Sequence, residues 1–206
     1  MIRFPFFLRL LLMMVVAAQL VACSKTVKWE EEVLLNTGQT VIVKQSVVYE
    51  IGGDAGNPFD LGFRPSGKRK LEFVWDKKNY VFDLKAGVMV LAISPNNQPI
   101  LVAPADAGAW YATNSYQCTL PFYVQFSYDD ASKRWVWPKS VDLWVYELPA
   151  NLLRDFKSPD EMKKRYTSAD IADQGYMHDP SLTSVHKIDK KYTGDLCKSK
   201  FSQQEK

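Results

Sequence analysis

Histidine and cysteine are scarce in this chain: its 206 residues include two histidines and three cysteines. The two histidines do not have the spacing of zinc ligands. The sequence also has no P-loop, no glycine-rich dinucleotide-binding turn and no nucleophile elbow. These absences count against the common enzyme classes, and no cofactor or metal is expected.

A large excess of charge of one sign is also missing: the chain has 26 basic and 23 acidic side chains, and its net charge is +3. Setting aside Arg3 and Arg9 near the start leaves 24 of the 26 basic side chains, almost matching the acidic total. The composition therefore implies no field for binding a polyanion, and nucleic acid is not an expected partner.

The only long apolar run lies at the start of the chain. Arg3 and Arg9 precede the apolar residues 10–18, and small residues follow before Cys23. A transmembrane helix needs about 20 apolar residues, so this run is too short to span a bilayer. The layout is typical of a cleavable secretory signal.

Cys23 closes this segment in the sequence "LVAC", which resembles the lipobox of bacterial lipoproteins. The resemblance implies that the Cys23 sulfur receives a diacylglycerol, that the leader is cut before it, and that the new amino terminus is acylated, with chains such as palmitate. Several acyl chains, at roughly 0.8 kcal/mol per buried methylene, would hold the protein firmly in a membrane. A simple secretory signal, or an uncleaved anchor with an incidental cysteine, is the alternative. Ser24 is not the aspartate of an inner-membrane retention signal, so we expect the outer membrane, with the body in the periplasm.

Four segments follow from this interpretation. Residues 1–22 are the predicted signal peptide, and residues 23–29 are the predicted lipid anchor and polar tether. Residues 30–192 are expected to form one β-rich periplasmic domain, because a chain of this length can bury a sizeable single core. The polar residues 193–206 are expected to form a partly disordered tail.

Cys118 and Cys197 are the two cysteines beyond the leader, and an oxidising periplasm favours a disulfide between them. Such a bridge would close a loop of about 80 residues and contribute about 2 to 4 kcal/mol. Two unpaired structural thiols are an alternative. A further alternative makes one cysteine a nucleophile with His178 or His186 as its base.

The body reads as strands separated by turns. Residues 31–50 predict a hairpin about Asn36, Thr37 and Gly38. Residues 52–68 are rich in Gly, Pro, Asn and Asp and predict a long surface loop. Residues 71–84 alternate apolar and polar side chains on both sides of "DKKN" and predict a second hairpin.

Later segments continue the pattern. The apolar runs 88–94 and 99–105 predict central strands covered on both faces. Residues 121–128 predict a strand with Phe122, Val124, Phe126 and Tyr128 on one face, and "RWVWP" and "VDLWVYEL" complete the set, with a last strand possible in 181–189. A short helix is expected from Ser158, with a second helical turn over 168–173. The fold class is therefore mostly β, an antiparallel sandwich or strongly bent barrel of seven to ten strands with a small C-terminal helical element.

Several passages resemble a group of proteobacterial envelope lipoproteins that has no established activity. The resemblance rests on "KWEEEVLLNTGQTV", "GGDAGNPFD", "LAISPNNQPILVAPA", "YQCTLPFYVQF" and "RWVWP", and it extends through "LPANLL" to the helix expected at Pro159. It implies the envelope location and a single body. It assigns no catalytic residue.

Three groups of carboxylates could supply the acid and base of a glycosidase. They are Asp129 with Asp130, Glu30 to Glu32, and Asp54 with Asp60. Acidic neighbours in turns are mostly solvated and rarely converge on one substrate atom. The Asp54–Asp60 stretch could also bind calcium, although its spacing does not match an EF-hand.

Aromatic side chains form a second candidate group. Trp110, Tyr111 and Tyr116 lie in loop-like sequence and form the predicted exposed binding patch, although core packing is the alternative. The favoured function is a non-enzymatic envelope lipoprotein that binds a protein, peptidoglycan or another envelope component through its loops. The alternative is a membrane-tethered hydrolase of cell-wall or other polymer, so enzymatic activity stays open.

Overall fold

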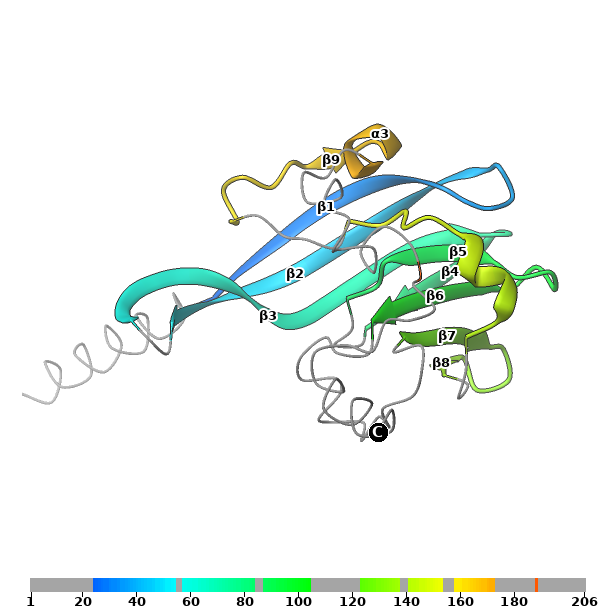
Figure 1. Cartoon of the computed structure of the whole chain (residues 1–206), viewed down its shortest axis with the longest axis horizontal. Coiled ribbons are helices and arrows are strands. Elements are labelled where there is room, and N and C mark those ends of the chain that lie inside the picture. Colours follow the sequence, from blue (N-terminus) through cyan, green and yellow to red (C-terminus); the bar gives the residue numbers. More distant parts are fainter. Residues whose placement is uncertain are drawn as a thin grey trace, which may run out of the picture.

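A computed structural model describes residues 24–54, 57–83, 87–104, 123–137, 141–153, 158–172 and 188. In this part of the chain, nine strands form two sheets (Figure 1). The strands are β1 (Ser24–Leu34), β2 (Thr40–Asp54), β3 (Asn57–Trp75), β4 (Lys78–Phe82), β5 (Val90–Ile93), β6 (Pro99–Pro104), β7 (Tyr123–Asp129), β8 (Arg134–Val136) and β9 (Arg165–Tyr166). A 3-10 helix, η2 (Leu143–Glu147), and a short α-helix, α3 (Ser168–Ala172), complete the elements.

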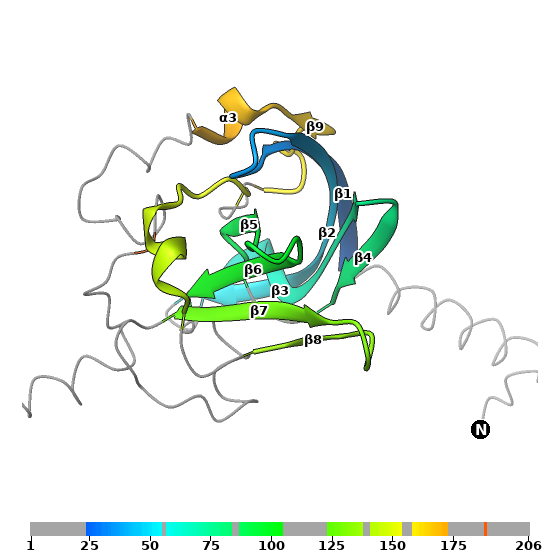
Figure 2. The same cartoon turned by 90° about the vertical axis from the view of Figure 1, so that its right-hand side faces the viewer.

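The first sheet, which we call sheet A, has the order β4-β3-β2-β1-β9, and sheet B has the order β5-β6-β7-β8. All neighbours are antiparallel except β1 and β9. Seen along the long strands, sheet A curves around sheet B (Figure 2). The mostly β sandwich with a small C-terminal helical element, predicted from the sequence, is confirmed.

The first hairpin is confirmed, and it is longer than expected. Gly38 supplies the positive φ, 82°, that the turn between β1 and β2 requires. From there the pairing continues to Ser24, which lies opposite Glu50. The predicted tether, residues 24–29, is therefore the first half of β1, and Trp29 within it is buried.

The surface loop predicted for residues 52–68 is wrong. β2 continues to Asp54 and β3 begins at Asn57, so this stretch forms the outer half of a long hairpin. Register shifts between Val47 and Tyr49 and between Gly52 and Asp54 let the glycine- and proline-containing segment bend while it stays paired. The paired strands thus accommodate turn-forming residues at these register shifts.

The second predicted hairpin is confirmed in β3 and β4. Its two-residue turn uses Asp76 and Lys77, whose φ angles of 46° and 64° match the twist of paired strands. Phe73 and Tyr80, on facing positions, stack with ring centroids 5.3 Å apart. The alternation seen in the sequence therefore buries one face of this hairpin.

β5 and β6 are buried along their whole length, as their apolar runs predict. β5 nevertheless stands at the end of sheet B and is not a central strand. Side-chain amides take the place of a neighbouring strand: Asn36 accepts from the Ile93 N–H and donates to the Ile93 carbonyl, both at 2.8 Å. Asn151 does the same for Leu91, at 2.9 and 2.8 Å, and also donates to the Leu34 carbonyl of β1.

Three groups of buried side chains make up the core. The largest lies between the sheets, where Phe82 and Phe126 meet edge to face at 5.0 Å. Val124 and Phe126 of β7 belong to this group and Tyr128 packs against it, so the predicted apolar face is confirmed for these three residues, while Phe122 lies outside the described part. The second group lies on the other side of β5 and β6, and the third lies under β1 and α3.

Two local predictions in the C-terminal third are wrong. Residues 141–148, predicted as a strand, contain η2, with Val145 and Tyr146 buried in the second core group. The helix expected from Ser158 is a turn, and the helical segment is α3, where the expected second turn lies. Tertiary packing overrides the local preference in both places.

Several predictions fall on residues outside the described part. These are Cys23, the Cys118–Cys197 disulfide, the aromatic patch Trp110, Tyr111 and Tyr116, His178 and His186, the strand 181–189 and the tail 193–206. Within the described part, no helix has the length and apolar character needed to cross a membrane. Among the same residues, no group of three or more His, Cys, Asp or Glu side chains could hold a metal ion.

Candidate functional site

The outer face of sheet A carries the most distinctive set of charged side chains in the described part of the chain. Strand alternation places Lys28, Ser46 and Lys70 side by side on β1, β2 and β3. Two residues away along each strand, on the same face, Glu30, Lys44 and Glu72 form the next row. We call these two rows, with Lys164 and Arg165 beside β1, the lysine face.

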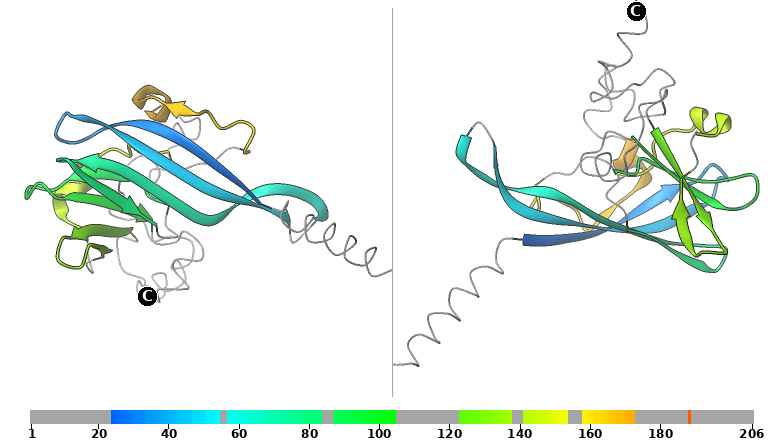
Figure 3. Two further views of the ribbon diagram at one scale, coloured as in Figure 1. Left: turned by 180° about the vertical axis from the view of Figure 1, so that it is seen from behind. Right: turned by 90° about the horizontal axis from the view of Figure 1, so that it is seen from below.

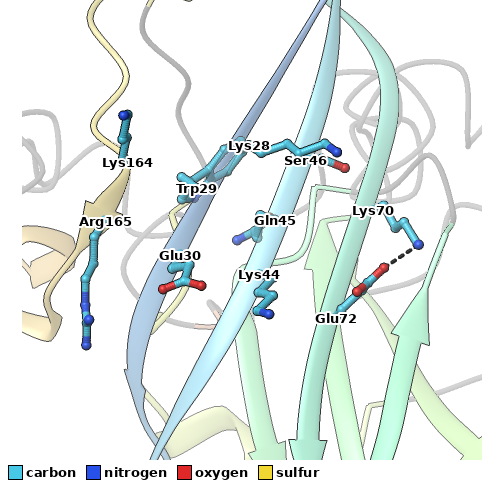
Figure 4. A pocket seen from close by; sticks show the side chains of 10 residues that line it. All are labelled: Lys28, Trp29, Glu30, Lys44, Gln45, Ser46, Lys70, Glu72, Lys164 and Arg165. Atoms are coloured by element: carbon cyan, nitrogen blue, oxygen red, sulfur yellow. Dashed lines mark ion pairs between the residues drawn. The ribbon is translucent and has the colours of Figure 1, made fainter.

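The lysine face is hollowed rather than flat (Figure 4). The hollow has a volume of about 650 Å³, and all eight residues of the lysine face line it, together with Trp29 and Gln45. The segment before β9 closes one side, because the Glu30 N–H donates to the Lys164 carbonyl at 3.0 Å. The outer face of sheet A is therefore concave where β9 pairs with β1.

Charges on this face are only partly paired. Lys70 forms an ion pair with Glu72, and Arg165 pairs with Glu32 at 2.5 Å. Lys28, Lys44 and Lys164 are exposed, and within the described residues none of their ammonium groups has a hydrogen bond or ion pair. Three ammonium groups are thus available to an anionic ligand.

The pKa of Glu72 reflects the positive electrostatic potential of the lysine face. It is lowered first by the hydrogen bond from Lys70, and the positive charges of Lys44 and Lys28 lower it further. The pKa of Lys70 is raised by the same hydrogen bond. The face therefore favours negative charge, and a carboxylate or phosphate of a ligand would experience the same attraction.

Glu31 points to the opposite side of β1, into the core, where its side chain is fully buried. One carboxylate oxygen accepts from Trp29 Nε1 at 2.6 Å and from Gln45 Nε2 at 2.7 Å. The other accepts from the Leu153 N–H at 3.0 Å. Burial raises the pKa of Glu31 to about 7, and the three hydrogen bonds oppose that rise.

The Glu31 arrangement is structural rather than catalytic. Its side chain is fully buried and both oxygens accept hydrogen bonds from the protein, so a substrate cannot reach the carboxyl group. Its partners join β1, β2 and the segment at Leu153, which holds the strap 151–153 against sheet A. Glu31 therefore fixes the sheet that presents the lysine face.

The predicted carboxylate pairs do not converge on one cleft. Asp129 accepts from Ala131 and Ser132 within its own turn, and Asp130 pairs with Lys78. Glu30 and Glu32 point to the outer face of sheet A and Glu31 points inward. The side chains of Asp54 and Asp60 lie outside the described residues.

Glu30 and Glu72 share the hollow, but Lys44 lies between them. A glycosidase needs one carboxyl group with a raised pKa as its acid. The pKa of Glu72 is lowered instead. The geometry of the face thus suits the binding of an anion better than acid–base chemistry.

Three other aromatic side chains, on β7, β8 and η2, are packing groups. Trp135 meets Tyr128 and Phe82 edge to face, at 5.4 and 5.6 Å, and its Nε1 donates to the Val81 carbonyl of β4. Tyr123 and Tyr146 are buried in the second core group. These three side chains therefore serve core packing.

The lysine face was not predicted from the sequence, although part of the signal was present. The turn at Asn36–Gly38 fixes the register that sets Lys28 opposite Ser46 and Glu30 opposite Lys44. β3 pairs with β2 on the other side and contributes Lys70 and Glu72. β9 adds Lys164 and Arg165 from far along the chain.

No family model, curated protein or solved structure matches the chain.

Proposed function

We propose that this chain is a non-enzymatic lipoprotein of the bacterial cell envelope, and that it binds an anionic envelope polymer on the lysine face. The single observation that carries the binding role is the group of three unpaired ammoniums, Lys28, Lys44 and Lys164, in one hollow of about 650 Å³. Ammonium groups pair with carboxylates and phosphates without fixed geometry. A flexible polymer that carries many such groups suits them.

Peptidoglycan is the polymer that we select for the proposal. Its peptide stems carry carboxylates, and a protein anchored to the outer membrane faces it across the periplasm. Ion pairs on an open face are individually weak, at about 0.2 to 1 kcal/mol each. Repeated contacts along one polymer would add to a useful affinity.

The anchoring part of the proposal rests on the leader and the sequence "LVAC". Acylation of Cys23 would place the protein on the periplasmic side of the outer membrane. The position of β1 fits this arrangement, because the strand begins at Ser24, the residue directly after the proposed lipid site. A tethered hydrolase receives less support, since no two described carboxylates form an acid–base pair.

Co-sedimentation with purified peptidoglycan sacculi tests the binding role. We expect the variant Lys28→Gln/Lys44→Gln to bind about five- to tenfold more weakly than the wild type, as the loss of two exposed ion pairs implies. The matched control is Lys77→Gln/Lys133→Gln, which removes the same charge from two exposed turn residues on other parts of the surface. It should bind like the wild type.

The salt dependence of binding provides a second readout. Screening weakens contacts between exposed charges, so wild-type binding should fall as the salt concentration rises. The Lys28→Gln/Lys44→Gln variant should show a shallower fall. Equal binding by both double variants and the wild type would refute the role of the lysine face.

Intact-mass analysis of protein from its native host tests the anchor. The wild type should lack residues 1–22 and carry the mass of added lipid. The variant Cys23→Ala should accumulate as the uncut precursor. An unmodified Cys23 in the wild type would remove the membrane part of the proposal.

A further inference from the structure

We infer that the outer halves of β2 and β3, residues 48–54 and 57–65, rest on the surface of the same bilayer that holds the Cys23 lipid. We call this part of the hairpin the arm. The inference rests on the proposed acylation of Cys23 and extends it, because it assigns an orientation and a second membrane contact to the folded body.

The register of the hairpin places the anchor beside the arm. Ser24 lies opposite Glu50, and Cys23 is joined to Ser24 by one peptide bond. Consecutive Cα atoms are about 3.8 Å apart, so the proposed lipid site lies within one residue of the sheet. No flexible spacer separates lipid and sheet.

β2 and β3 continue past this point while β1 does not. Ile51 pairs with Phe63, Gly52 pairs with Gly62, and Asp54 pairs with Asn57. At about 3.3 Å per residue, residues 51–54 of the arm reach about 13 Å beyond the start of β1. Figure 3 shows this hairpin extending past the first residues of β1.

The side chains at the base of this extension are apolar and exposed. Ile51 is 46 % exposed and Phe63 is 39 % exposed, although the two lie directly opposite each other. They continue the face that is buried further along the sheet at Val47 and Tyr49. An apolar pair at the level of a lipid anchor suits the interface between headgroups and acyl chains.

Charged groups limit how deeply the arm can lie. Arg64 and Lys68 stand on β3 next to the apolar pair, and Lys68 forms an ion pair with Glu50 at 3.2 Å. Asp54 and Asp60 also belong to the hairpin. Carboxylates do not enter the hydrocarbon region readily, so we place the arm at the headgroup level.

Bromine quenching of an added tryptophan tests the contact. The acylated variant Ile51→Trp is reconstituted into vesicles of phosphatidylcholine and phosphatidylglycerol, with and without bromine on the acyl chains. We expect bromine to reduce the emission added by Trp at position 51 by about twofold or more, since an interfacial side chain lies close to the upper acyl carbons. Wild-type emission is subtracted, because the chain contains six tryptophans.

Val74→Trp is the matched control. Val74 lies on the same strand, β3, at its opposite end, and is 57 % exposed. Its added emission should not change with brominated lipid. The difference between positions 51 and 74 measures orientation, which acylation alone does not set.

The outcomes separate the two proposals. A reconstituted protein whose mass shows no lipid would overturn the anchor, and the inference with it. An acylated protein in which position 51 is not quenched would overturn the inference and leave the anchor intact. Equal quenching at positions 51 and 74 would also overturn it, because the body would then lie along the membrane.

Discussion

Sheets A and B use the same kind of strand in different ways. In β1 of sheet A, buried and accessible side chains alternate from Trp29 to Leu34, whereas every residue of β5 and β6 in sheet B is buried. One face of sheet A is therefore free to carry the lysine face. Sheet B provides apolar contacts on both sides.

The two sheets therefore contribute differently to the protein, sheet B mainly to stability and sheet A also to the outer surface. In sheet B, β5 and β6 gain stability by burying both faces, so these two strands are continuous apolar runs. Sheet A buries one face against sheet B and exposes the other, so its outer residues can vary without disturbing the core. We expect substitutions to affect stability in sheet B and ligand binding on the outer face of sheet A.

The largest expected effect is in sheet B. Phe126→Ala should lower the free energy of unfolding by about 3 to 5 kcal/mol, because Phe126 is fully buried between the sheets and leaves a cavity. Phe63→Ala makes the same chemical change in sheet A, where the ring is 39 % exposed, and should cost well under half as much. Urea unfolding of both variants measures the difference. Similar losses would contradict the division between the sheets.

The second effect is the pH dependence that Glu31 gives to sheet A. Its pKa is about 7 in the folded protein against 4.5 for an unperturbed side chain, so the folded state binds the proton more tightly. The contribution is fully present below the unfolded pKa and is lost as the pH rises through the folded pKa. Between about pH 4.5 and about pH 8 this amounts to a loss of about 3 kcal/mol.

Glu31→Gln isolates that contribution. The amide cannot titrate, so the change in unfolding free energy between acid and alkaline buffer should be smaller by about 3 kcal/mol than in the wild type. Glu161→Gln is the matched control, since it makes the same chemical change at an exposed side chain. If wild type and Glu31→Gln showed parallel pH profiles, the raised pKa of Glu31 would be wrong.

The smallest of the three effects concerns the edge where the sheets are joined. Asn151→Ala removes the hydrogen bonds to the Leu91 N–H and carbonyl and to the Leu34 carbonyl. Leaving such backbone groups unpaired should cost about 1 to 3 kcal/mol. Hydrogen exchange at the Leu91 amide should become faster, while exchange at Leu101, which pairs within sheet B, should follow the global stability alone. Unchanged protection at Leu91 would show that β5 does not depend on this amide.

The parts of the fold that were predictable have local causes. The turns at Asn36–Gly38 and Asp76–Lys77 carry residues that accept positive φ, and the strands beside them alternate clearly. The apolar runs of β5 and β6 also predicted burial on both faces. Each of these signals lies within a few residues of the element it specifies.

The wrong predictions depended on distant partners. Residues 52–68 contain the residues of a loop, yet β2 and β3 stay paired from Tyr49 and Pro65 out to Asp54 and Asn57. Residues 141–148 have the composition of a strand, but η2 buries Val145 and Tyr146 against sheet B. Nothing in either segment alone reveals the partner.

The sequence by itself determined the class of the fold and the two short hairpin turns, because side-chain periodicity and turn chemistry are local properties. Its nearly balanced charge gave no sign of an anion-binding surface. Only the tertiary structure brought Lys28, Lys44 and Lys164 to one hollow, and only it placed Glu31 in the core with three donors. The physical reason is that the field at a surface depends on which charges become neighbours, and long-range strand pairing decides this.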